Sequence, residues 1–195
     1  MRGVALAEVL LVVVLALMSL AVAVPSLAYL RDEGRAAAGA RQMAATFSAL
    51  RFQSVARGRT TGLLFERGGG GWLWWEVGDG NGNGLRTSEV RRGVDPIRSG
   101  PHRLEDRVES VRLGFPRGAS SIPEIPPQTG TIADLDDPIQ FGRSDLVSFA
   151  PGGSASSGTL YLTDGKSVLY GVVLYGPTSR VRVWRYDTLR RRWTL

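Results

Sequence analysis

The sequence contains no cysteine and only one histidine, His102. The absence of cysteine excludes disulfide bonds, thiolate metal sites and a cysteine nucleophile. We interpret His102 as a surface residue, because it stands alone in a segment without a catalytic or metal-binding pattern. The serine-rich segment 152–158 lacks the nucleophile-elbow pattern of serine hydrolases. The sequence therefore predicts neither an enzyme nor a protein with a bound cofactor.

Lysine is almost absent too, since Lys166 is the only one and arginine supplies the other basic side chains. The formal net charge is +6, and residues 180–195 hold six arginines against one aspartate. Hydrophobic residues make up 43% of the chain and charged residues 22%, which indicates a folded rather than a disordered protein. Its 195 residues leave room for one apolar helix and one modest globular domain.

The longest hydrophobic run occupies residues 4–30 and contains a single charged residue, Glu8. Such a run is long enough to cross a bilayer, which takes about 20 apolar residues. A carboxylate near the start of a hydrophobic helix costs about 1 to 3 kcal/mol unless it finds a partner, so its presence suggests a function. One basic residue, Arg2, and one glycine, Gly3, precede the run.

These N-terminal residues resemble the processing signal of type IV pilins and pseudopilins. In that family prepilin peptidase cuts after a glycine, which matches Gly3, and the new N-terminus, here Val4, is methylated. Glu8 matches the glutamate at the fifth mature position, and Pro25 stands where pilin helices carry a proline. The residues at 4 and 5 depart from the usual phenylalanine or methionine followed by threonine.

The resemblance implies a leader at residues 1–3 and a transmembrane or filament-core helix at residues 4–30. It also implies a single-pass inner-membrane protein with a cytoplasmic N-terminus and a periplasmic C-terminal domain, later extracted into a filament. During assembly, Glu8 of one subunit is expected to pair with the Val4 ammonium of another. The implied partners are prepilin peptidase and other pilin or pseudopilin subunits. An ordinary secretory signal ending at residues 21–23 and an unprocessed membrane anchor remain as alternatives.

Helical periodicity continues over residues 31–58, where small and apolar residues recur every three or four positions and Gly58 ends the helix. Residues 59–195 predict a β domain, in which a Pro-rich loop at 116–144 is interpreted as a variable surface insertion rather than a binding loop. The fold class is therefore α+β, with a long N-terminal helix packed on an antiparallel sheet. Short β-type runs separated by glycine, proline, asparagine and aspartate place its strands at 60–66, 72–77, 111–115, 146–150, 160–163, 167–175 and 180–186, and the glycine run 68–71 joins the first two as a hairpin.

The glycine- and asparagine-rich segment 78–84 contains Asp79, Asn81 and Asn83, which occupy the first alternate ligand positions of an EF-hand loop. The twelfth position is Val90, with Glu89 one residue early, so a bidentate carboxylate is missing from its usual place. Asn-Gly pairs are also typical of hairpin turns. We favour a turn and retain a calcium site as the weaker alternative.

A pilin-like helix followed by segments 78–84, 156–165 and 179–186 resembles the minor pseudopilins of the GspH/FimT type. Members of that family pack a long N-terminal helix against β-sheets and serve in type II secretion pseudopili or type IV pili. The resemblance predicts an assembly subunit of such a machine. Some FimT-type members bind DNA during uptake, so a DNA-binding minor pilin for natural transformation is the alternative.

The C-terminal strand carries the residues for that alternative. In segment 179–186 the valines alternate with Arg180, Arg182 and Trp184, so one face is apolar and the other basic and aromatic. FimT-type receptors have a Gly-Arg-x-Arg motif here, but Ser179 replaces the glycine. Basic and aromatic side chains together suit phosphate contacts and base stacking. Two other interpretations of these residues remain, namely a solvated strand edge whose charges prevent sheet aggregation, or a face that contacts another pilin. The DNA-binding candidates are Arg180, Arg182, Trp184, Arg185, Arg190, Arg191 and Arg192.

Overall fold

The computed structural model describes residues 2–142 and 144–195, without the side chains of residues 2–5 and 22–28. It has the expected α+β composition, with a long N-terminal helix and antiparallel sheets. Its contacts divide the chain into two compact units, Met1–Gly34 and Arg35–Leu195.

Helix α1 comprises Arg2–Arg57 and ends where the sequence predicts, at a glycine in the left-handed region, Gly58, with φ of 61°. In the first unit, the large apolar side chains that the structure describes between residues 6 and 20 are all exposed. Leu6 is 72% exposed, Leu10 is 62% and Leu17 is 59%. Glu8 is exposed among them.

The predicted inner-membrane location is wrong, because no helix in the described part of the chain combines the length and the apolar character that a membrane crossing requires. Gly3, Val4 and Pro25, on which the processing prediction depends, lie outside the residues whose side chains are described.

The second unit contains two antiparallel sheets. The first sheet has the order β3-β2-β1-β6, built from β1 (Thr61–Gly68), β2 (Gly71–Gly78), β3 (Ile97–His102) and β6 (Leu146–Phe149). Strands β1 and β2 form the hairpin that the glycine run between them predicts. A short helix, α2 (Thr87–Arg91), lies between β2 and β3 in the chain.

The second sheet has the order β10-β9-β8-β7-β4, with β5 also paired to β7. Its strands are β4 (Arg112–Leu113), β5 (Ile139–Gln140), β7 (Gly158–Thr163), β8 (Leu169–Tyr175), β9 (Arg180–Asp187) and β10 (Arg192–Thr194). A single turn of 3₁₀-helix, η1 (Gly176–Thr178), joins β8 to β9. Strands β7, β8 and β9 therefore follow one another as a meander.

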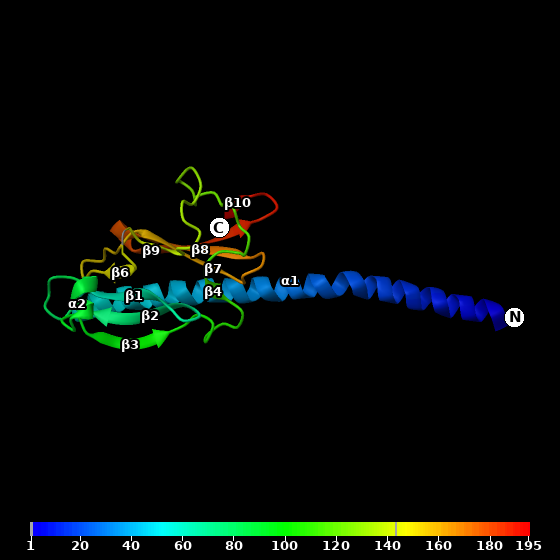
Figure 1. Cartoon of the computed structure of the whole chain (residues 1–195), viewed down its shortest axis with the longest axis horizontal. Coiled ribbons are helices and arrows are strands. Elements are labelled where there is room, and N and C mark those ends of the chain that lie inside the picture. The colour runs from blue at the N-terminus through cyan, green and yellow to red at the C-terminus, as the bar shows by residue number, and fades with distance from the viewer. Residues whose placement is uncertain (1, 143) are drawn as a thin grey trace. The chain divides into compact units, whose positions relative to one another are not determined.

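The main core lies between the two sheets and the part of α1 that belongs to the second unit. Figure 1 shows β8 and β9 on one side of this helical segment and β3 on the other. Phe47 of α1 is fully buried, and its ring centroid lies 6.1 Å from that of Phe141 and 5.9 Å from that of Phe149. Small residues such as Ala36 and Ala40 let the sheets approach the helix closely.

A second core lies on the other face of the second sheet, where residues 116–138, which we call the cover segment, pack over the strands. The segment is irregular, as its prolines predict, but Ile122, Ile125 and Ile132 are buried. Trp193 of β10 donates its Nε1–H to the Pro123 carbonyl at 2.7 Å. Figure 1 shows β10 close to this green segment. The cover segment therefore contributes buried side chains to the second core, whereas we expected a variable surface insertion.

Candidate binding groove on the terminal strands

The alternation of β9 separates its side chains as the sequence predicts. Val181 and Val183 pack against the main core, whereas Arg180, Arg182 and Trp184 belong to the opposite face. Strand β8 runs antiparallel to β9, with Tyr175 opposite Arg180 and Val173 opposite Arg182. Two basic residues are thus set beside an aromatic and an apolar residue on one face of the sheet.

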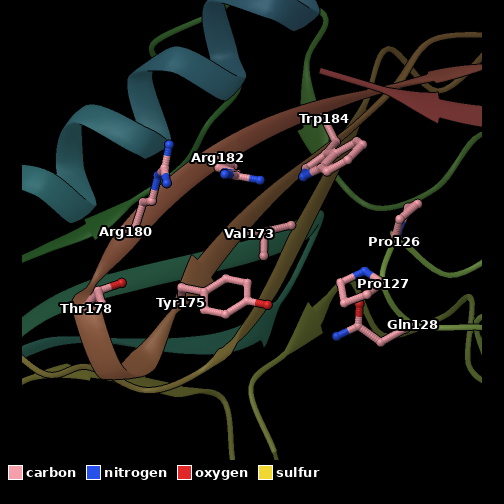
Figure 2. A pocket seen from close by; sticks show the side chains of 9 residues that line it. All are labelled: Pro126, Pro127, Gln128, Val173, Tyr175, Thr178, Arg180, Arg182 and Trp184. Carbon is pink, nitrogen blue, oxygen red and sulfur yellow. The ribbon is translucent and has the colours of Figure 1, made fainter.

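These side chains line a hollow of about 240 Å³, which we call the groove. Figure 2 shows the arginines and the tryptophan following one another along β9, with Val173 and Tyr175 beside them and the loop 126–128 across from them. The loop belongs to the cover segment and closes one side of the groove. The lining residues are Pro126, Pro127, Gln128, Val173, Tyr175, Thr178, Arg180, Arg182 and Trp184.

The side chains of the two arginines of the groove have no hydrogen bond or ion pair with any residue that the structure describes. Arg180 is exposed and Arg182 is half-buried. Trp184 is held more firmly, because it packs against the second core together with Val173. The groove therefore combines two uncompensated positive charges with a rigid apolar wall.

The other predicted DNA-binding residues do not line the groove. Arg185 lies opposite Tyr170, on the side of the sheet that covers the main core. Arg190 pairs with Asp187 at 3.9 Å, and Arg191 donates from Nη2 to the Ser121 carbonyl at 3.2 Å. Arg192 is exposed at the start of β10 and does not line the groove.

Asp187 organises the turn between β9 and β10. Its Oδ1 accepts the backbone N–H groups of Leu189 and Arg190, both at 3.0 Å. The hydrogen bond from the Arg190 backbone lowers the pKa of Asp187, with the Leu189 N–H and the nearby guanidinium groups acting in the same direction. Arg191, with φ of 49°, completes the turn.

The aromatic residue at the end of this turn is not available for stacking on a ligand. Trp193 is only 7% exposed, and its ring centroid lies 5.1 Å from that of Tyr186 and 6.0 Å from that of Tyr161. It fixes the cover segment instead. Of the seven candidate residues, the structure brings three together at the groove, namely Arg180, Arg182 and Trp184.

One edge of β9 is open over five residues. Strand β10 pairs only with residues 185–187 of β9, while β8 pairs with all of the residues 180–186 on the other side. Among the described residues, no strand pairs with the outer edge of residues 180–184. This open edge adjoins the groove, because it belongs to the same residues.

The predicted asparagine-glycine turn is a loop between β2 and α2 rather than a hairpin connection. Buried Asp79 accepts backbone N–H groups from Asn81, Gly82 and Gly84. Glu89 accepts the side-chain amides of Asn81 and Asn83 at 3.3 and 3.1 Å. Within the described residues, no group of three or more histidine, aspartate or glutamate side chains has an arrangement that holds a metal ion. These carboxylates close the loop through hydrogen bonds.

His102 is half-buried rather than a free surface residue. Its Nε2 lies 3.0 Å from the hydroxyl of Ser99, and its ring centroid lies 5.9 Å from that of Trp74. The guanidinium of Arg107 covers the same tryptophan, 5.7 Å from the ring centroid. These contacts account for His102 as a packing residue of the first sheet.

Sequence reasoning missed the groove residues that come from outside β9. Tyr175 carries a detectable signal, since it ends an alternating strand that must pair with β9 across a short turn. Pro127 and Gln128 carry no such signal, because only the folded cover segment brings them to the sheet.

No protein-family model, curated protein or solved structure matches this chain.

Proposed function

We propose that this protein is a structural subunit of a pilus-like filament, a minor pseudopilin of a type II secretion pseudopilus or a type IV pilus. The observation that carries the proposal is the exposed apolar surface of α1 between residues 6 and 20. This helical segment is followed in the chain by the second unit, which has its own core. The chain therefore combines a helix with exposed apolar side chains and a folded domain. That combination suits a protein whose helix packs with the helices of other subunits.

The exposed apolar side chains of α1 leave a large area that packing against another helix would bury. Burying one leucine or valine side chain completely is worth about 1.5 to 3 kcal/mol. Large exposed apolar patches mark interaction surfaces, because monomeric proteins rarely leave them in water. Helices of neighbouring subunits offer the matching apolar surface, and interdigitation of side chains stabilises such a bundle. The pilin-like fold and the GspH/FimT relationship belong to this proposal.

Glu8 gives the filament its register in this proposal. Prepilin peptidase cleaves between Gly3 and Val4, and the methylated amine of Val4 stays positively charged. In a bundle of apolar helices, that ammonium and the Glu8 carboxylate of a neighbour are each costly alone and favourable as a pair. A misaligned subunit leaves both charges without a partner.

Cysteine cross-linking in the cells that make the protein tests this proposal, because the natural chain has no cysteine. The variant Leu17→Cys places a thiol on the exposed apolar helix, and Ala133→Cys places one on an exposed site of the second unit as the matched control. We expect the Leu17→Cys protein to cross-link to pilin-like subunits that carry a cysteine at the corresponding depth. Cross-links formed equally by the control, or none at all, contradict the proposal.

Two further measurements examine the processing and docking steps. Mass spectrometry of the native protein should show an N-methylated chain beginning at Val4, whereas a chain beginning at Met1 or Val24 excludes prepilin processing. Glu8→Ala should reduce the amount of protein recovered in sheared filaments without reducing its total amount. Incorporation equal to that of the natural protein rules out the docking role of Glu8.

A DNA-binding minor pilin for uptake is the second candidate function. Its supporting observation is that Arg180 and Arg182 face the groove without a partner among the described residues. Phosphate contacts make DNA binding strongly dependent on salt. Binding of the full chain to single- and double-stranded oligonucleotides at several salt concentrations therefore tests it, with the Arg180→Ala, Arg182→Ala variant alongside.

A further inference from the structure

We propose that residues 180–184 of β9 form a docking edge for an extended acidic segment of a partner protein. The segment adds beside β9 as a further strand of the second sheet. Its acidic side chains, placed two residues apart, lie opposite Arg180 and Arg182. The proposal concerns the second unit alone and does not depend on the filament function of α1.

The backbone of the open edge provides the first part of the argument. An unpaired edge strand presents free N–H and C=O groups that a second extended chain can satisfy. The other outer strands are less suitable among the described residues. Strand β3 contains Pro101, which has no N–H to donate, and β10 has only three residues. The outer side of β6 is bridged by Ala155 and hydrogen-bonded by Ser156.

The side chains provide the second part. Directly opposite residues in paired strands have Cβ atoms about 5 Å apart, so a carboxylate opposite each arginine is within reach of its guanidinium. Arginine binds carboxylates through two parallel hydrogen bonds, which fixes orientation as well as charge. Because neither arginine has a partner among the described residues, docking breaks no ion pair there.

The groove provides a place for an apolar side chain of the same segment. Its wall at Trp184 is fixed by contact with the second core, and Pro127 faces it from the cover segment. A third side chain two residues beyond the acidic pair points to this face, since alternate residues of a strand share a face. The recognised pattern is therefore two acidic residues and one apolar residue at alternate positions.

The observations favour a peptide over a nucleic acid. Arg185 lies on the opposite face, Arg190 is paired with Asp187, and Arg191 is bonded to the cover segment. Two arginines neutralise few phosphates, whereas tight DNA binding typically uses 6 or more contacts, as an order of magnitude. The edge also presents carbonyl groups, which a peptide N–H satisfies and a phosphate repels.

The same charges give the edge selectivity. Basic residues on an edge strand oppose pairing with another basic strand, including β9 of a second copy. An acidic strand converts this repulsion into attraction. The edge thus avoids self-association and still accepts a partner of opposite charge.

Fluorescence anisotropy with the full chain tests the proposal. The probe is a labelled nonapeptide whose central residues are Asp-Thr-Asp-Thr-Val, flanked by glycine and serine. Three comparison probes are a peptide with lysine in place of aspartate, a peptide N-methylated at alternate residues, and a single-stranded oligonucleotide. The variants are Arg180→Ala with Arg182→Ala, and Arg51→Ala with Arg57→Ala as a control that loses equal charge from exposed positions of α1.

We expect the acidic peptide to bind the natural chain and the Arg51, Arg57 control equally. The Arg180, Arg182 variant should bind about fivefold or more weakly, as for the loss of two ion pairs near the protein surface. The lysine and N-methylated peptides should not bind measurably. Equal binding of the N-methylated peptide refutes strand addition, and equal binding by the Arg180, Arg182 variant refutes the arginine contacts. Tighter binding of the oligonucleotide, lost in the same variant, overturns the proposal in favour of DNA.

Discussion

Replacing Trp193 should separate the two roles that this side chain has at the C-terminal end of the second sheet. Its indole ring packs on Tyr186 and Tyr161, and its Nε1–H donates to the Pro123 carbonyl at 2.7 Å. Trp193→Phe keeps an aromatic ring in the second core and removes the hydrogen bond. Trp193→Ala removes both, and with them the main contact between β10 and the cover segment.

The expected costs follow from burial and hydrogen bonding. Trp193 is 7% exposed, and truncating a buried tryptophan to alanine costs about 3 to 5 kcal/mol. Losing one hydrogen bond to a partly buried carbonyl costs about 1 to 2 kcal/mol, which is the expectation for Trp193→Phe. Trp184→Phe is the matched control, because Trp184 is half-buried on the same face and its side chain has no hydrogen bond to a described residue.

Urea unfolding of residues 35–195, followed by circular dichroism, measures these costs, since that unit contains both cores. Limited trypsin digestion adds a local measurement, because Arg117 is exposed in the cover segment. Cleavage at Arg117 should be faster in Trp193→Ala than the measured loss of global stability predicts, because the cover segment unfolds locally. Equal stability of Trp193→Phe and the natural unit, with unchanged cleavage, refutes the idea that this hydrogen bond anchors the cover segment.

Two other predictions concern glycine packing and acid stability. Gly39→Ala should lower the free energy of unfolding by about 1 to 3 kcal/mol, because a Cβ added at this position would lie 2.9 Å from Val111 Cγ1. Gly34→Ala should raise it by about 0.5 to 1 kcal/mol, because a Cβ added there would meet no atom within 4 Å. Thermal or urea unfolding measures both changes. Asp187 has a folded pKa below its unfolded value of about 3.9, so its ionised form stabilises the fold above that pH and the contribution disappears as the pH falls through the folded pKa. NMR titration should show the low midpoint, and Asp187→Asn should show a smaller loss of stability on acidification; a normal midpoint contradicts this.

The elements with a local sequence signal were predictable. A glycine run between two apolar segments indicates the β1–β2 hairpin, apolar alternation indicates β7 and β9, and Gly58 marks the end of α1. Strand β3 escapes this signal because the segment Ile97–His102 contains a glycine and a proline and no apolar alternation. Strand β10 escapes it because three residues cannot show a period.

The basic face of β9 was predictable, but the extent of the candidate site was not. Counting arginines over residues 180–192 treats them as one surface, whereas the strand period sends Arg185 to the other face. The turn then assigns Arg190 to Asp187 and Arg191 to Ser121. The groove also needs Pro127 and Tyr175, and only tertiary packing brings the first of these to β9.

The second core and the groove are parts of one arrangement. A Cβ at Gly171, which lies opposite Trp184, would come within 2.5 Å of Ile125 Cδ1, so the cover segment packs directly on the strand pair at this point. The next residues of that segment, Pro126 to Gln128, form the wall of the groove. A ligand that binds only the assembled groove must therefore stabilise the cover segment, by an amount set by its concentration and affinity. Loosening Trp193 should accordingly weaken binding at a site that Trp193 does not line.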